Sequence, residues 1–192
     1  MFFFKRMRNK RALNVLVVTN ALILIAGAMM GPIYALFVEE IGGNLLDASI
    51  AGAIFALAAG MTVLIVGRIT DKIKQQRYVV IFGYLMMALG FFLYLFVNSI
   101  WFLFAIQIII GFGEAIYSPA FDAIYSKHTT KHHEGREWAL WESMMYFTTA
   151  FGAMAGGLLA YNFGFNAIFI VMAGLCIISA LYLTLISKKV LK

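Results

Sequence analysis

Charged residues are scarce in this 192-residue chain, and their scarcity identifies the solvent that the protein needs. Asp, Glu, Lys and Arg make up only 12% of the residues, whereas 63% are hydrophobic, and the mean hydropathy is +0.90. A water-soluble domain of this size needs a larger polar surface, so the composition excludes that class of protein. A lipid bilayer accommodates such a composition. We therefore expect the lipid bilayer to be a partner of this protein.

Cysteine and histidine are almost absent, and this limits the chemistry that the chain can carry. The one cysteine, Cys176, lies in an apolar run, which excludes an internal disulfide framework and disfavours a structural zinc site. The histidines His128, His132 and His133 fall between two apolar runs, where we expect solvent-exposed loop positions. No histidine lies within an apolar run and no glycine-rich phosphate loop is present. We therefore predict no metal, no cofactor and no enzyme activity.

Six apolar segments are long enough to cross a bilayer, which takes about 20 residues of helix. The connections between them are short, so the pattern predicts a single all-α transmembrane domain over residues 1–192. Only Asn98 and Ser99 divide the third segment from the fourth, and a tight turn is expected there. The first segment has no small-residue cleavage site and is expected to be a retained span. The predicted spans are 12–38, 48–66, 77–97, 100–127, 137–161 and 165–187.

Lysine and arginine are confined to alternate connections between these spans. The connections near 39–47, 98–99 and 162–164 contain none of them. By the positive-inside rule both termini are then cytoplasmic, in a multi-pass protein of the cell (plasma or inner) membrane. Because the basic residues sit at the ends of apolar runs, we attribute the net charge of +6 to topology and expect no nucleic-acid partner. The 15 basic residues are Lys5, Arg6, Arg8, Lys10, Arg11, Arg68, Lys72, Lys74, Arg77, Lys127, Lys131, Arg136, Lys188, Lys189 and Lys192.

The most specific motif lies between the second and third predicted spans, in residues 67–77, GRITDKIKQQR. Its spacing of glycine, aspartate and basic residues, and its place in the topology, resemble the signature loop of the major facilitator superfamily, although Ile73 replaces the usual second glycine. The resemblance implies a latch in which Asp71 faces the positive end of the fifth helix of the opposite half. Asp122 is expected to pair with Arg68, Lys72 or Arg77. The implied gating residues are Gly67, Asp71, Lys72, Lys74, Arg77 and Asp122.

The fourth predicted span carries a polar stripe in an otherwise apolar sequence. Its members recur every three or four residues and share one helix face: Gln107, Gly111, Glu114, Ser118 and Asp122. Glu114 is near the middle of the span, where an ionisable group is costly unless it faces a cavity or a partner. We expect Glu114 to carry a proton; the alternative is a permanently neutral acid hydrogen-bonded within the bundle. The stripe begins like the superfamily's fourth-helix motif, but Gln107 replaces the expected arginine, which disfavours arginine-based proton coupling.

Two other spans contribute candidate residues. In the first span Asn20 and Tyr34 share a face, and Gly31-Pro32 is expected to kink its outer part. The superfamily lines its cavity with the first and fourth helices of each half, so the resemblance implies that Asn20 and Tyr34 face the cavity. A hydrogen bond from Asn20 to another helix is an equal alternative. In the fifth span Glu142 is predicted either to bind a proton or substrate or to pair with Arg136.

The resemblance extends over the whole chain, which has six predicted helices where the superfamily has twelve. Two parallel copies would rebuild twelve helices about a two-fold axis. Residues 152–157 also resemble the superfamily's antiporter motif, with Ala153 in place of proline. The leading hypothesis is therefore a secondary active transporter of small solutes, proton-coupled, working by alternating access as a homodimer. Its predicted substrate- and proton-binding residues are Glu114, Gln107, Asn20, Tyr34, Ser118 and Glu142.

Two other classes of function remain as alternatives. The chain is then either a non-transporting half, including an assembly partner for another six-helix protein, or, less favoured, an intramembrane enzyme. If the chain transports, an acidic and aromatic cavity without basic residues favours neutral or cationic lipophilic solutes over anions.

Overall fold

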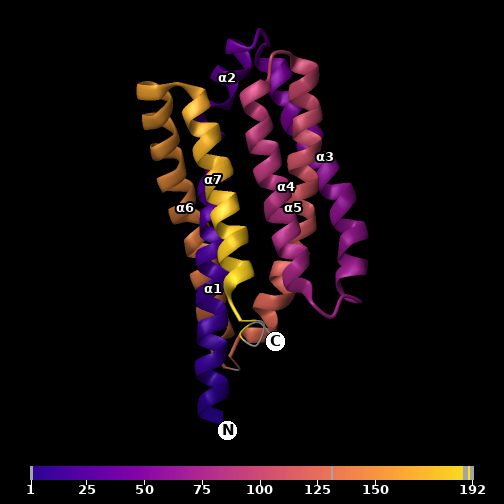
Figure 1. Cartoon of the computed structure of the whole chain (residues 1–192), viewed down its shortest axis with the longest axis vertical. Helices are drawn as coiled ribbons and strands as arrows, with labels where there is room; N and C mark the ends of the chain where they lie inside the picture. Colours follow the sequence, from indigo (N-terminus) through magenta and orange to yellow (C-terminus); the bar gives the residue numbers. More distant parts are fainter. Residues whose placement is uncertain (1, 131, 188–189, 191–192) are drawn as a thin grey trace.

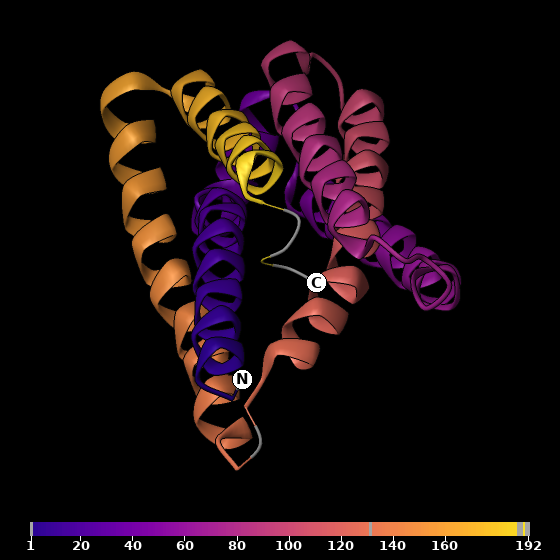
Figure 2. The ribbon, with the colours of Figure 1, turned by 60° about the horizontal axis from the view of Figure 1, so that its bottom comes forward.

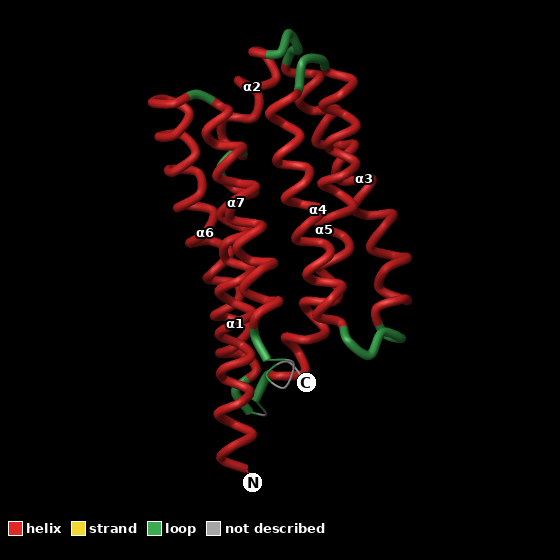
Figure 3. The backbone as a smooth tube through the Cα atoms, viewed as in Figure 1, coloured by secondary structure: helices red, strands yellow, loops and turns green. Residues whose placement is uncertain are grey.

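A computed structural model of the chain describes residues 2–130, 132–187 and 190, and the described residues form helices joined by short turns (Figures 1 and 3). The long elements are α1 (Phe2–Ala28), α3 (Leu45–Thr70), α4 (Gln76–Leu93), α5 (Ile100–His128), α6 (Glu134–Phe163) and α7 (Phe165–Leu185). The short ones are the 3-10 turn η1 (Gly31–Ile33), the helix α2 (Tyr34–Glu40) and the 3-10 turn η2 (Tyr94–Phe96).

The first predicted span is a broken helix. α1 begins at Phe2, ten residues earlier than the predicted span, and ends at Ala28. Pro32 lies in η1, where its missing N–H donor is tolerated, and the chain resumes as α2. The kink predicted at Gly31-Pro32 is therefore confirmed, and it places α2 at one end of the bundle (Figure 1).

Local sequence explains where several helices begin. Asn44 caps α3: its side chain accepts a hydrogen bond from the Leu46 N–H at 2.8 Å, while the Asp47 carboxylate accepts from the Asn44 N–H at 2.9 Å. Ser99 caps α5 by accepting from the Phe102 N–H at 3.3 Å, which produces the turn expected after Asn98. Gly164 has φ +77°, a conformation that glycine adopts readily, and it turns α6 directly into α7.

The helices pack in a pattern that is repeated in the two halves of the chain. α1 packs on α6 as α5 packs on α3, and α4 packs on α7 (Figure 2). If α1, α3 and α4 are exchanged with α5, α6 and α7 respectively, these pairings are preserved. Nested three-helix repeats of this kind occur in some transporters. Consequently α3 and α6 lie at the margins of the bundle. In α3 only Ala48, Ala51 and Thr70 are buried.

Five helical stretches among the described residues are long and apolar enough to cross a membrane. They are Lys10–Glu40, Leu45–Thr70, Gln76–Phe96, Ile100–His128 and Phe165–Leu185. α6 has sufficient length, but its glycines, threonines and polar end residues make it less apolar, so the sixth span remains a prediction.

The connections sort into two ends of the bundle. α1 begins, α3 passes to α4, α5 passes to α6, and α7 finishes at one end, at the bottom of Figure 1. We call this the basic end, because the described lysines and arginines belong to these segments. Lys131, Lys188, Lys189 and Lys192 lie outside the described residues. The grouping agrees with the predicted topology, while the cytoplasmic location of this end remains a prediction.

Candidate functional site

Two glycines fix the position of α5 and therefore of Glu114. A side-chain carbon at Gly111 would lie 2.7 Å from the Phe55 carbonyl oxygen of α3, and one at Gly113 would lie 2.9 Å from the Met87 nitrogen of α4. Only glycine permits such close backbone approaches, so α5 is clamped between α3 and α4. Glu114 follows directly and lies midway along α5, between Ile100 and His128.

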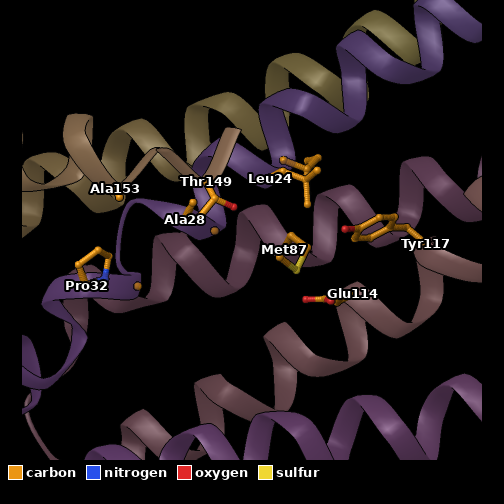
Figure 4. A pocket seen from close by; sticks show the side chains of 11 residues that line it. Leu24, Ala28, Pro32, Met87, Glu114, Tyr117, Thr149 and Ala153 are labelled. Carbon is orange, nitrogen blue, oxygen red and sulfur yellow. The ribbon is translucent and has the colours of Figure 1, made fainter. Parts of the chain in front are cut away.

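Glu114 lies at a cavity of about 460 Å³ between α1 and α5, with walls from α4 and α6 (Figure 4). It is the single charged residue of the lining, which is otherwise apolar apart from Tyr117 and Thr149. Figure 4 shows the side chains of Met87, Tyr117 and Glu114 gathered on one side of this cavity. Glu114 therefore faces space rather than a basic partner, an arrangement suited to binding a proton or a cation.

A second cavity of about 330 Å³ adjoins the first and shares Gly27, Gly31, Met87 and Glu114 with it. One wall of this cavity consists of aromatic side chains and the amide of Gln107. The aromatic residues are Tyr34, Phe55, Phe91 and Tyr94. Together the two cavities place one carboxyl group between an apolar region and an aromatic region.

The amide of Gln107 joins two tyrosines at this wall. Its Nε2 donates to the Tyr34 hydroxyl and to the Tyr94 hydroxyl, the latter at 3.2 Å. Because Tyr34 belongs to α2 and Tyr94 to η2, Gln107 links these two elements to its own helix, α5. Of the six residues predicted to bind substrate or protons, the structure brings Glu114, Gln107 and Tyr34 to one site.

The other three candidates line neither of these two cavities. Asn20 is buried in the core, where its Oδ1 accepts a hydrogen bond from the Tyr84 hydroxyl of α4 at 3.2 Å. Ser118 is half-buried one turn beyond Glu114, and Glu142 is exposed on α6. Their roles in binding remain predictions. Sequence reasoning missed Tyr117, which the three-residue spacing from Glu114 could have indicated, and Tyr94, for which we find no sequence signal.

Of the three basic residues expected as partners of Asp122, which were Arg68, Lys72 and Arg77, Arg77 binds elsewhere. The Arg77 guanidinium is buried and donates to the Ile186 carbonyl at 2.6 Å and the Thr184 carbonyl at 2.7 Å, at the end of α7. The last carbonyls of a helix lack donors from the helix itself, so carbonyls at this end of α7 are natural partners for a cation. Asp122 is exposed on α5.

The signature loop is also tied to α5. Gln76 donates from Nε2 to the Thr70 carbonyl at 3.2 Å and accepts from the Lys127 ammonium at 2.8 Å. Three other predicted gating residues, Asp71, Lys72 and Lys74, are exposed. A side-chain carbon at Gly67 would meet nothing within 4 Å. The loop therefore presents its remaining motif residues outward.

One histidine lies elsewhere than expected. His128 is buried at the end of α5, with its Nδ1 at 2.8 Å from the Ile124 carbonyl oxygen, because α5 extends one residue past the predicted span. His132 and His133 are exposed, as expected of a loop. The described residues contain no group of His, Cys, Asp or Glu that could hold a metal ion.

This arrangement of helices agrees with comparisons to known proteins. Residues 16–191 match the Major Facilitator Superfamily, and the chain belongs to that family. It is thus a multi-pass membrane protein.

Individual relatives are distant and longer. Multidrug resistance protein MdtG of Salmonella schwarzengrund (strain CVM19633) is 25% identical over 180 residues, which cover 92% of this chain and 44% of that protein. The MdtG protein of Salmonella arizonae (strain ATCC BAA-731 / CDC346-86 / RSK2980) is 24% identical over the same shares. The in meso crystal structure of the POT family transporter PepTSo superposes with a TM-score of 0.73 at 19% identity, over 91% of this chain and 37% of that one. The chain thus spans less than half the length of these relatives.

Proposed function

We propose that the chain acts as one half of a secondary active transporter that moves small solutes across the cell membrane by alternating access, coupled to protons. The observation that carries the proposal is the placement of Glu114, a carboxyl group at mid-helix that faces two joined cavities and no basic partner. A carboxyl group in a membrane is retained where it binds a proton, an ion or a substrate. Membership of the superfamily and the names of the MdtG relatives support transport as the use of that site.

We further propose that a second six-helix half completes the transporter, and that this half is a second copy of the chain. The margins of the bundle support this assembly. α3 exposes Leu57, Met61 and Leu64 by 65%, 68% and 73%, and α6 exposes Tyr146 and Phe147 by 71% and 67%. A parallel two-fold dimer would cover these faces and enclose Glu114 of both copies between the halves. Both termini are then cytoplasmic, and the six helices all span the membrane.

The chemistry of the cavity walls indicates the class of substrate. Glu114 supplies the negative charge, Tyr34, Tyr94 and Phe91 supply aromatic faces, and neither lining contains a lysine or arginine. Aromatic faces attract organic cations, and a carboxylate completes their recognition. We therefore propose neutral or cationic lipophilic solutes as substrates, in keeping with the multidrug resistance named for the MdtG relatives.

Transport of a lipophilic cation by purified protein in vesicles tests this function. Vesicles containing the chain, with an imposed pH gradient, are expected to move radiolabelled tetraphenylphosphonium or ethidium against its concentration gradient. Glu114→Gln keeps the size of the side chain and removes the exchangeable charge, so it is expected to abolish gradient-driven movement. The matched control is Glu40→Gln, an exposed glutamate at the end of α2, which is expected to transport as the wild type does.

Two results would contradict the proposal. Unchanged transport in Glu114→Gln would remove the proton-carrying role of Glu114. Absence of transport by the folded wild-type protein, for both cations, would favour a non-transporting half or an assembly partner of another six-helix protein.

A further inference from the structure

Hydrogen-bond donors gather in one wall of the second cavity, in the side chains of Gln107, Tyr34 and Tyr94. The Gln107 amide nitrogen carries two hydrogens, and it donates to the Tyr34 hydroxyl and to the Tyr94 hydroxyl. A tyrosine hydroxyl that accepts from an amide keeps its own hydrogen for another partner. Among the described residues no group accepts either hydroxyl hydrogen. Two O–H donors therefore remain at this wall.

These donors belong to a rigid, buried part of the bundle. Gln107 and Tyr94 are only 6% and 5% exposed. The Tyr94 ring is stacked with the Phe169 ring, with centroids 5.0 Å apart, and meets the Phe37 ring edge to face at 5.7 Å. Packing on this scale fixes where the hydroxyl lies. Because buried donors in proteins are nearly always paired, the wall is suited to a ligand that supplies an acceptor.

Glu114 lines the same cavity at a different level of α5. It lies two helical turns from Gln107, which is about 10 Å at the rise of an α-helix. Glu114 is the single charged residue of this lining. Apart from it and the three donor residues, the lining consists of glycine, methionine, isoleucine and phenylalanine. The cavity thus has a negative group at one level, two O–H donors at another, and apolar walls.

The acceptor that fits the two hydroxyls is an uncharged one. An anionic group buried there would need a cation nearby, and neither cavity is lined by a lysine or an arginine. A carbonyl or ether oxygen needs only hydrogen bonds. Its two lone pairs can accept from both hydroxyls, because the two hydroxyl oxygens lie within hydrogen-bond distance of one amide nitrogen.

We propose that the transported solute is a two-ended organic cation. Its positive group binds Glu114, and a neutral oxygen roughly 10 Å away accepts from Tyr34 and Tyr94. This names the substrate class of the proposed function and rests on that function. Gln107 is a positioning residue, because it holds the two hydroxyls in place. The tyrosines determine specificity, since a site built to hydrogen-bond a ligand disfavours an analogue that lacks the bonding group.

Two matched cations test this specificity by competition binding. Both are biphenylmethyl-trimethylammonium ions, one ending in an acetyl group and the other in an isopropyl group of similar shape. Each displaces radiolabelled tetraphenylphosphonium from the purified protein in lipid nanodiscs, and the readout is the ratio of the two half-displacement concentrations. We expect the wild type to bind the acetyl cation about tenfold more tightly, the effect of two modest net hydrogen bonds.

Variants of the donor wall should change this ratio. Tyr94→Phe and Tyr34→Phe each keep the ring and remove one donor, so each is expected to lower the preference to about threefold. Gln107→Leu releases both hydroxyls and should lower it at least as far. A change that merely loosened the cavity would weaken both cations alike and leave the ratio unaltered. Tyr182→Phe, which removes an exposed hydroxyl on α7, is the control and should keep the wild-type ratio.

The remaining outcomes overturn the inference. A wild-type ratio near one, with both cations displacing tetraphenylphosphonium, would contradict the donor wall and leave the proposed function standing. A preference that survives both tyrosine variants would place the acceptor elsewhere. Tighter binding of a carboxylate-ended analogue than of the acetyl cation would replace the neutral oxygen with an anion. If the folded wild type neither binds nor transports tetraphenylphosphonium, the proposed function fails, and the specificity fails with it.

Discussion

Two adjacent glycines on α6 show how differently the inner and outer faces of this bundle are used. A side-chain carbon at Gly156 would collide with the carbonyl oxygen of Met29, the residue that follows α1, because α6 is in backbone contact with the chain there. One at Gly157 would meet nothing within 4 Å. The inner face of α6, which includes Gly156, packs against the rest of the chain, whereas the outer face at Gly157 contacts no other described helix.

The same contrast separates α5 from α3. Gly111 of α5 has no room for a side chain, whereas a side-chain carbon at Gly52 or Gly60 of α3 would meet nothing within 4 Å. Lipid tails are as apolar as leucine, so in a membrane it is close packing rather than hydrophobicity that brings helices together. Glycines therefore mark a helix contact only where another helix is present, and among the described residues none packs against Gly60 or Gly157.

The largest effect is expected from filling the inner glycine. Gly156→Leu forces α6 away from α1 and should lower the free energy of unfolding by about 3 kcal/mol or more. Gly157→Leu should change it by less than about 0.5 kcal/mol. Thermal unfolding can be followed with a thiol-reactive fluorogenic dye, because Cys176 is the one cysteine of the sequence and is fully buried. Equal unfolding temperatures for the two variants would mean that α1 and α6 are not in contact.

A smaller effect is expected at the signature loop, where one arginine is bound and another is exposed. Arg77→Leu removes two charged hydrogen bonds to the end of α7 and should cost about 2 kcal/mol of unfolding free energy. Arg68→Leu, at an exposed position, should cost less than about 0.5 kcal/mol. The same dye assay measures both variants. If Arg68→Leu proved the more destabilising, the attachment of the loop to α7 would be wrong.

The smallest effect on the fold, but the most direct test of the open faces, comes from intersubunit cross-linking. The cysteines for cross-linking must be exposed, as Ile69 at the end of α3 and Arg136 on α6 are. The neighbouring Thr70 is buried and therefore unsuitable. In a Cys176→Ser background, Ile69→Cys and Arg136→Cys together should give a disulfide-linked dimer in native membranes, while the pair of cysteines leaves the fold unchanged. Each single cysteine is the control. Folded, inserted protein that never forms this dimer would rule out self-assembly through α3 and α6.

Much of the architecture could be predicted from the sequence. Apolar runs of span length predict the long helices, Gly31-Pro32 predicts the break between α1 and α2, and the motif at 67–77 indicates the superfamily to which the chain belongs. These features are local or periodic in the sequence, so they can be recognised without knowing which helices pack together. Glu114 is likewise conspicuous from its sequence position alone, because a carboxyl group in mid-span is unusual wherever it points.

The sequence did not predict which side chains and backbone groups each polar residue contacts. Gln107 and Asp122 share one helix face with Glu114, yet Gln107 binds two tyrosines and Asp122 is exposed. Arg77 was one of three candidate partners for Asp122, and it binds backbone carbonyls more than 100 residues away in the sequence. A helical stripe determines which residues lie on the same side of a helix. What faces that side depends on the helices that pack against it.

The sequence by itself therefore determined the solvent, the helices, the family and the one carboxyl group in mid-span. Composition and periodicity encode these directly, because a bilayer accepts only long apolar helices with paired backbones. Only the tertiary structure decided that Asn20 joins Tyr84 in the core while Tyr34 joins Gln107 at the cavity. Those two choices depend on how closely the glycines let α1, α4 and α5 approach, a property of several helices at once.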